Sequence, residues 1–302
     1  MKSAIRFRKD SQNEFIKLFS GLCRSKSSWE VWADFIAMSA ITISTAFDQE
    51  GPTHDARIKE YMRTIQRYSK ADQQVFPKLF AVTVNALDDE PDQDFFGELF
   101  MGLDLGNHWK GQFFTPYSIS RMLAEIQIEG LEAHIEKKGW VGIHDPCCGA
   151  GSLLIAARNV MVRKEMSPTT ALYVAQDIDR TAALMCYIQL SLLGCAGYVV
   201  VADSLCNPLA GHGSSPLLID PKAGQEVWLM PALYDETWCM RIQWERIKLA
   251  LELMGAMGGT QKRQVQDLEQ APQNNEQPQI NFAVNPVSRP LNEGPGGQLT
   301  LF

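Results

Sequence analysis

The chain has 302 residues, of which 45% are hydrophobic, and its 28 basic and 35 acidic side chains give a net charge of −7. This length allows one sizeable core plus an appendage or a second small domain. The acidic balance argues against strong autonomous DNA binding but is compatible with a local basic groove. No apolar run is long enough to span a bilayer, and the basic start of the chain lacks the apolar segment of a signal peptide.

The cysteines and histidines indicate no metal site. Seven cysteines are present without a C-x-x-C spacing, and the five histidines show no ligand spacing with cysteines or acids. Cys147 and Cys148 are adjacent, which disfavours a structural disulfide between them. We therefore expect reduced thiols and a cytoplasmic location, with no membrane partner.

Residues 1–105 are predicted to form an all-helical domain. Apolar residues recur at helical spacing in 14–19 and 29–36, where Ser28 is a candidate cap. Further helices are predicted from Pro52, over 73–87 and over 94–103, and a helix over 117–126 follows Thr115 as a cap and Pro116 as its first residue. The helical block by itself indicates no chemistry.

A glycine-containing turn, Asp145-Pro-Cys-Cys-Gly-Ala-Gly151, lies between a predicted strand (140–143) and a predicted helix (152–158). A turn of this kind exposes backbone and a helix N-terminus to a small ligand. It lacks the lysine of a phosphate loop and the third glycine of a dinucleotide fingerprint. Its acidic start, Asp145-Pro146, instead suits a ligand that carries an amine.

Two further predicted strands also end in carboxylates. The strand 171–175 leads to Asp177, and the strand 198–202 leads to Asp203, with a helix over 181–193 ending at Gly194 between them. Because ligands bind at the carboxyl edge of open α/β sheets, Asp145, Asp177 and Asp203 are expected to meet there. A nucleoside with an amine fits such a set best.

Four ordered segments resemble motifs of the N6-adenine DNA methyltransferase family, most closely the modification subunits of type I restriction systems. They are Gly111-Gln-Phe-Phe-Thr-Pro116, Asp145–Gly151, Gln176-Asp-Ile-Asp179 and Asp203-Ser204. The resemblance implies a Rossmann-like core that binds S-adenosylmethionine, with a helical domain before it. It also implies a sequence-specificity subunit as a partner on DNA.

The resemblance also implies individual roles. Thr115 and Pro116, with Phe114, would lie beside the methionine end of the cofactor. Asp145, with Pro146, would meet its amino group, and Gly149 and Gly151 would flank the sulfonium. Asp177 would hold the ribose and Asp203 the adenine amine.

The catalytic tetrapeptide of the family, Asn/Asp-Pro-Pro-Tyr/Phe, is not found. The best fourth strand, 226–229, runs into Met230-Pro231-Ala-Leu-Tyr234, where a thioether replaces the expected amide. Asp220-Pro221 offers a carboxylate without an aromatic, and Asn207-Pro208 follows Asp203 too closely for another strand. No later strands are predicted after a helix over 236–254, so the sheet is expected to be truncated and catalysis is in doubt.

The predicted domains are thus a helical domain (1–105), a methyltransferase-like core (106–255) and a disordered Gln/Pro-rich tail (256–302). The tail ends in Gln298-Leu299-Thr300-Leu301-Phe302, which resembles the bacterial sliding-clamp-binding peptide. Three functions follow: adenine-N6 methylation of DNA with a specificity partner, an inactive cofactor-binding accessory recruited through the clamp, and methylation of RNA or protein.

Overall fold

The computed structural model describes residues 9–24, 26–105, 113–209 and 215–269. The chain divides into two compact units, Met1–Leu251 and Glu252–Phe302, and the second contributes only the end of a helix to the description. None of the described helices is both long and apolar enough to cross a membrane.

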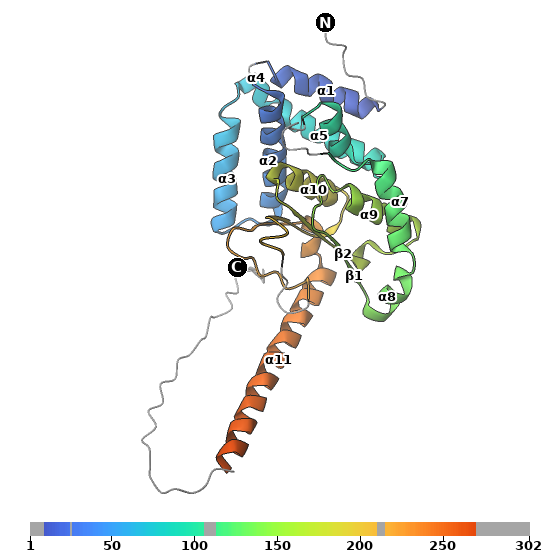
Figure 1. Cartoon of the computed structure of the whole chain (residues 1–302). Coiled ribbons are helices and arrows are strands. Elements are labelled where there is room, and N and C mark those ends of the chain that lie inside the picture. The colour runs from blue at the N-terminus through green and yellow to red at the C-terminus, as the bar shows by residue number, and fades with distance from the viewer. Residues whose placement is uncertain (1–8, 25, 106–112, 210–214, 270–302) are drawn as a thin grey trace. The chain divides into compact units, whose positions relative to one another are not determined.

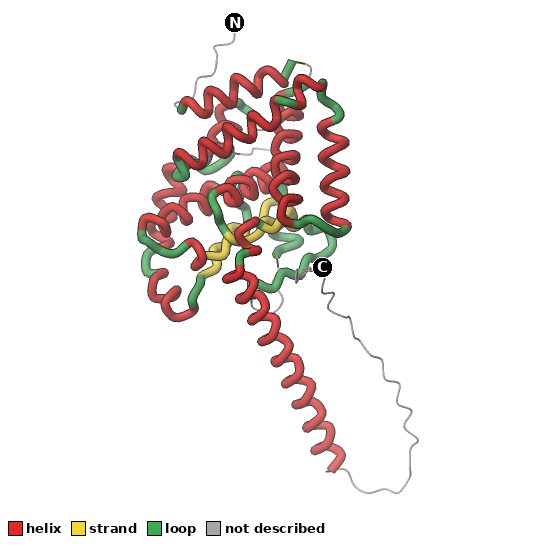
Figure 2. The backbone as a smooth tube through the Cα atoms, turned by 180° about the vertical axis from the view of Figure 1, so that it is seen from behind, coloured by secondary structure: helices red, strands yellow, loops and turns green. Residues whose placement is uncertain are grey.

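The first unit begins with a group of helices that lies on one side of the sheet (Figures 1 and 2). They are α1 (Asp10–Leu22), α2 (Ser28–Phe47), α3 (Pro52–Ile65), α4 (Lys70–Gln73), α5 (Val75–Asp89) and α6 (Phe95–Gly102). The helical nature predicted for this part is confirmed. Ser27, rather than Ser28, caps α2, because its side chain accepts the Glu30 amide.

An α/β core follows, as the sequence predicted. Its elements are α7 (Tyr117–Ile128), α8 (Leu131–Lys138), β1 (Val141–Asp145), α9 (Ser152–Arg163), β2 (Ala171–Asp177), α10 (Arg180–Leu192), β3 (Ala196–Val201), β4 (Glu226–Leu229) and α11 (Glu236–Glu269). Short 3-10 turns, η1 (Pro168–Thr170) and η2 (Pro231–Tyr234), precede β2 and α11. Helix α11 is longer than predicted, because the residues after Met254 include good helix formers such as Gln, Lys and Leu.

The four strands lie in the order β1-β2-β3-β4. The first three are parallel, with Asp145 paired to Ala175 and Asp177 paired to Val201. The fourth strand runs antiparallel to β3, with Tyr198 paired to Leu229. The carboxyl ends of β1, β2 and β3 therefore share one edge of the sheet, whereas β4 ends at the opposite edge.

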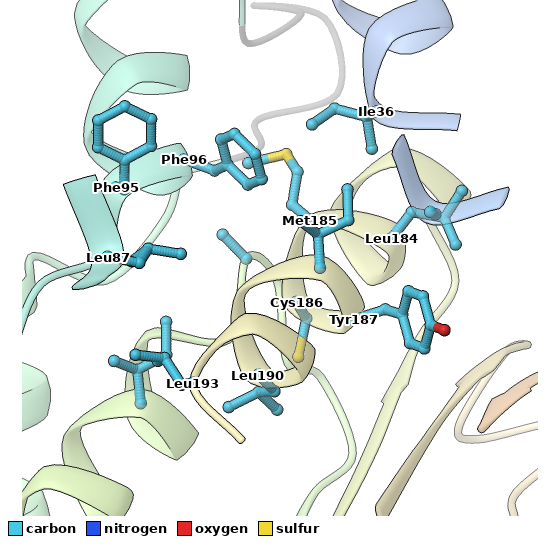
Figure 3. Packing of buried hydrophobic residues seen from close by; sticks show 14 of the residues in the cluster. Ile36, Leu87, Phe95, Phe96, Leu184, Met185, Cys186, Tyr187, Leu190 and Leu193 are labelled. Atoms are coloured by element: carbon cyan, nitrogen blue, oxygen red, sulfur yellow. The ribbon is translucent and has the colours of Figure 1, made fainter. Parts of the chain in front are cut away.

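Helix α10 joins the helical cover to the sheet. All residues from Ala182 to Leu190 are buried, as expected for a helix with apolar neighbours on every side. Figure 3 shows Met185 of α10 beside Phe96 of α6, and Leu184 toward Ile36 of α2. One continuous apolar core results, so the boundary predicted at residue 105 coincides with no break in packing. As a division of the chain it stays a prediction.

A smaller apolar cluster covers the other face of the sheet. Trp238 and Ile242 of α11 and Leu233 of η2 pack there against strand residues such as Leu172 and Tyr198. The sheet is therefore covered on both faces, which accounts for the fully buried pattern of β2 up to its last residue.

Candidate functional site

The three predicted acids lie at the same edge of the sheet. Asp145 is the last residue of β1, Asp177 is the last residue of β2, and Asp203 stands two residues beyond the end of β3. Parallel pairing places these ends side by side. The structure thus brings together the strand tips that the sequence analysis singled out.

Asp145 is a buried carboxylate with one oxygen available. Its Oδ1 accepts the Cys147 amide at 3.0 Å, which shapes the start of the turn after Pro146. For Oδ2 we find no hydrogen bond within the described part of the chain. Burial raises the pKa of this carboxyl, against the opposing effect of that amide and of the adjacent His144. A desolvated carboxylate of this kind is stabilised by a cationic ligand.

Asp177 organises the backbone around it. Its Oδ2 accepts the Gly149 amide at 2.8 Å, and its Oδ1 accepts the Asp179 amide at 2.8 Å. Burial raises the pKa of Asp177, the two amides oppose this effect, and the nearby charges of Asp179 and Asp145 add a smaller increase. Asp179 itself caps α10 through the Thr181 and Ala182 amides. The edge therefore concentrates negative charge, which favours a positively charged ligand.

The two glycines of the turn are required by their surroundings. Gly149 has φ +52°, and a Cβ there would lie 3.0 Å from the Phe114 ring. Gly151 has φ +93°, and its Cβ would lie 2.8 Å from the Cys186 sulfur of α10. Both positions combine a left-handed backbone with a close neighbour, so only glycine fits without strain. The resulting surface leaves main chain open to a ligand.

The segment before α7 lies against this turn. The Ser152 hydroxyl donates to the Thr115 carbonyl at 3.4 Å and pairs with the Ser120 hydroxyl at 2.7 Å. Phe114, Thr115 and Pro116 are thereby placed beside the glycine turn. Thr115 does not cap α7 as predicted: Pro116 occupies the cap position and no side chain accepts a helix amide there. Gly111 and Gln112 lie outside the described residues.

Asp203 is half-buried, and it differs from the other two acids in the direction of its pKa shift. Its Oδ1 accepts the Leu205 amide at 2.8 Å and the Cys206 amide at 3.1 Å, and these bonds lower its pKa. The carboxylate is thus ionised. Ile178 and Leu205 expose apolar side chains at the same edge.

Gln176 is a site residue whose role the sequence analysis missed. Its buried amide donates to the carbonyls of Ala202 and Asn207 and accepts the Leu209 amide. This side chain therefore holds the segment that carries Asp203 against β2. The available signal was a polar amide inside an otherwise apolar strand.

A second missed residue is Gln189 of α10. Its amide donates to the Ala150 carbonyl and to Asp94, both at 2.9 Å, and it accepts the Phe96 amide at 3.1 Å. One side chain thus connects the glycine turn to the start of α6. A glutamine in the middle of an apolar helix was the visible clue.

The catalytic candidates after the fourth strand do not reach this edge. Because β4 is antiparallel, it carries Met230 to the amino end of β3, where the Met230 amide donates to the Gly197 carbonyl at 2.9 Å. Pro231 and Tyr234 follow in η2, and the Tyr234 ring stacks on Phe47 of α2. Sequence order suggested a catalytic position for this segment, but strand direction removes it from the acids.

The remaining predicted residues lie outside the acidic edge, are engaged by other groups, or fall outside the described residues. Asp220 lies in the loop before β4. Asn207 lies near the acidic edge, but its amide is engaged by the Ala223 carbonyl and by Gln225. The clamp-like residues Gln298, Leu299, Leu301 and Phe302 lie outside the described residues. Within the part of the chain that is described, no cluster of His, Cys, Asp or Glu could hold a metal ion.

Comparisons with known proteins agree with the motif analysis. Residues 103–223 match the family model described as N-6 DNA Methylase. A stretch of 83 residues is 35% identical to the type I restriction enzyme MpnII methylase subunit of Mycoplasma pneumoniae, and covers 27% of this chain and 14% of that relative. The family match spans the glycine turn and all three acids, and it supports the N6-adenine methyltransferase family that the motifs predicted.

A solved structure is also similar. It is described as a class I S-adenosylmethionine-dependent methyltransferase from Listeria monocytogenes, with a TM-score of 0.34 and 16% sequence identity. The similarity covers 76% of this chain and 69% of that chain.

Proposed function

We propose that this chain binds S-adenosylmethionine at the carboxyl edge of its sheet and takes part in the N6 methylation of adenine in DNA. The observation that carries the proposal is the pair of desolvated acids, Asp145 and Asp177, beside a turn that only glycine can form. S-adenosylmethionine carries an ammonium and a sulfonium, which match this charge. The match of residues 103–223 to the N-6 DNA Methylase model supplies the substrate class.

The residues would divide the work of holding the cofactor. The free oxygen of Asp145 would accept the amino group, and Asp177 would accept the ribose hydroxyls. Asp203 would meet the adenine amine, while the exposed Ile178 and Leu205 would cover the faces of the base. Phe114, Thr115 and Pro116 would enclose the methionine end. Bound there, S-adenosylmethionine supplies an electrophilic methyl group that an adenine amine can accept directly.

A partner is part of this proposal. The side-chain amide of Asn207 near the acidic edge is already engaged by the Ala223 carbonyl and by Gln225, so it is not free to hold a target adenine. Contacts to a flipped base and the choice of DNA sequence would then come from another subunit. A specificity subunit of the type I kind fits this need, as the similarity to the MpnII methylase subunit suggests.

A second candidate function is a cofactor-binding accessory without catalysis. The reversed direction of β4 favours it, because Met230, Pro231 and Tyr234 are separated from the acids. Recruitment to replicating DNA would depend on the terminal peptide, Gln298–Phe302, docking on the sliding clamp. Removal of Leu301 and Phe302 should then abolish binding to the clamp by the full chain.

Calorimetric titration with S-adenosylmethionine tests the cofactor claim. The Asp145→Asn variant keeps an acceptor for the Cys147 amide but loses the charge, so we expect affinity to fall at least about tenfold. Asp235→Asn, at an exposed acid just after η2, is the matched control and should bind normally. Equal affinities for the two variants would remove Asp145 from the site.

Methyl transfer to unmethylated genomic DNA, measured with labelled cofactor, then separates the two candidates. Transfer in the presence of a specificity subunit, lost in Asp145→Asn, supports the methyltransferase. Binding without transfer under any condition supports the accessory. A chain that does not bind S-adenosylmethionine contradicts both.

A further inference from the structure

Helix α11 carries an apolar stripe that nothing in its own unit covers. Met240, Trp244, Ile247 and Leu251 are exposed by 56, 59, 51 and 63%. They recur at alternating steps of four and three residues, which is the seam spacing of a helix that packs along another helix. The four residues, called the α11 stripe below, extend over about three helical turns.

The stripe points away from the sheet. Trp238 and Ile242, on the opposite side of the helix, are 1 and 7% exposed and pack on the second apolar cluster. With about 100° of rotation per residue, they lie roughly half a turn from Met240 and Trp244. The buried face of α11 is therefore complete without the stripe, and the stripe is not needed for the fold of this unit.

A groove of about 360 Å³ runs beside the stripe. Its lining includes Met240 and Trp244 from the stripe, and Trp140 and Lys138 from the segment before β1. Arg241 and Lys248 of α11 also line it, with Glu245 as its one acid. Glu245 forms an ion pair with Lys248 at 2.8 Å, so Lys138 and Arg241 are the two bases of the lining that have no acidic partner among the described residues, although the whole chain is acidic.

These bases are fixed in place by local contacts. The Arg241 guanidinium donates to the Gly139 and Thr169 carbonyls and lies 4.5 Å from the Trp238 ring centre. The Lys138 ammonium lies 4.6 Å from the Trp140 ring centre. Neither contact neutralises the charge, so positive charge remains at this side of the groove. An acidic group that binds along the groove would therefore meet positive charge that is already held in position.

The charge pattern disfavours a second copy of this chain as the occupant. Arg241 and Lys248 occupy one flank of the seam, and Gln243 and Ala250 occupy the other. Antiparallel self-pairing would bring the basic flanks together, and parallel self-pairing would place them against uncharged residues. Neither arrangement supplies the opposite charges that such seams use to select a partner.

We infer that the α11 stripe and its groove bind an amphipathic helix of a different protein, whose apolar seam is flanked by glutamate or aspartate. The seam of that helix would cover Trp244 and Ile247, while its acidic flank would face Lys138 and Arg241. This surface lies toward the amino edge of the sheet, so the inference is independent of the cofactor site and of the proposed function.

Fluorescence anisotropy with two designed peptides tests the inference on the full chain. Both peptides have about four heptads with an isoleucine and leucine seam, and they differ only in carrying Glu or Lys at both flanks. We expect the acidic peptide to bind at least about tenfold more tightly at low salt, and the difference to shrink as salt is added. Equal affinities, or tighter binding of the basic peptide, would overturn the inference.

Variants locate the binding surface. Ile247→Glu should reduce the affinity for the acidic peptide at least about tenfold, because it places a charge in the seam and repels the acidic flank. Leu253→Glu, at an exposed apolar residue of the same helix outside the stripe, should leave it unchanged. Circular dichroism confirms that both variants fold. Equal losses in the two variants contradict a specific stripe.

Light scattering on the full chain gives an independent outcome. A monomer that binds the acidic peptide supports the inference. A dimer that Ile247→Glu dissociates would show that a second copy covers the stripe, and would replace the inferred partner.

Discussion

Strands β1 to β3 differ from strand β4 in the direction in which they run through the same sheet. The first three run parallel and gather Asp145, Asp177 and Asp203 at one edge. The fourth pairs just as regularly with β3 but in the opposite direction. Its end, Met230, is therefore attached to Gly197 at the far side of the sheet.

This difference separates cofactor binding from target binding within the chain. A ligand crevice in an open sheet forms where the strand order reverses, with strands on both sides of the first one. Here β2, β3 and β4 all lie to one side of β1, so the described residues build only one wall of such a crevice.

The largest effect is expected at the strand that both regions share. A Cβ at Gly197 of β3 would lie 1.8 Å from the Tyr173 carbonyl oxygen, at φ +154°. Gly197→Ala should therefore lower the free energy of unfolding by about 3 kcal/mol or more, measured by urea denaturation. Gly142→Ala in β1 is the matched control, because its nearest neighbour would be 3.7 Å away. Similar losses at both positions would contradict the crowding at β3.

Gln189 connects Asp94 to the glycine turn, and the stability of the protein should depend on pH through Asp94. Burial raises the pKa of Asp94 to about 6, although Gln189 and the Gly97 amide donate to it. The folded state thus favours protonated Asp94. The contribution of Asp94 to the free energy of unfolding is therefore greatest below about pH 4 and is lost as the pH rises through about 6. Asp94→Asn keeps the acceptor, and should stabilise the protein at pH 7.5 by on the order of 2 kcal/mol.

Denaturation of both proteins at pH 4 and pH 7.5 checks this prediction. The advantage of Asp94→Asn should disappear at the lower pH. An advantage of the same size at both pH values would mean that ionisation of Asp94 is not its cause.

A smaller effect is expected at Asp203 of the cofactor edge. Asp203 is more exposed than Asp145, so a contact to a cofactor amine competes with water. Asp203→Asn should weaken S-adenosylmethionine binding by about threefold, less than Asp145→Asn, as measured by calorimetry. If Asp203→Asn has the larger effect, the cofactor is held by the more exposed acid rather than by the buried one.

No effect on the cofactor is expected at the end of β4. Tyr234 stacks on Phe47, and Met230 is buried at the amino edge. Tyr234→Phe and Met230→Leu should each leave the calorimetric affinity for S-adenosylmethionine within about twofold of the original protein, since conservative swaps preserve packing. A large loss in a folded variant would return this segment to the reaction centre.

Most of the local structure could be predicted from the residues. The bounds of β4, Glu226–Leu229, were predicted correctly. Helix α10 ends at Leu192 with Leu193 as its cap, one residue earlier than predicted, and Gly194, with φ +72°, follows that cap. Helix α8 was missed, because its short polar sequence has a weak apolar pattern. The roles of Gln176 and Gln189 were also missed, since their partners lie on other elements.

In the candidate site, too, local features could be predicted from the sequence and contacts between distant segments could not. The acids at the strand tips followed from apolar runs that end in aspartate. The closeness of Phe114 to Gly149 could not be derived from either segment alone, because it depends on how α7 packs on α9. The distance of Met230 and Tyr234 from the acids could not be derived from the sequence for a related reason: strand direction is not a local property.

The amino-acid sequence by itself determined most of the strands, turns and helices, and which strand ends carry acids. Apolar spacing, capping residues and glycines act within a few residues, so these features can be read along the chain. Only the tertiary structure decided that β4 pairs antiparallel with β3, that Gln189 reaches the glycine turn, and that the α11 stripe is left uncovered. Each of these depends on contacts between residues far apart in sequence, whose free energy is set by the packing of the whole unit.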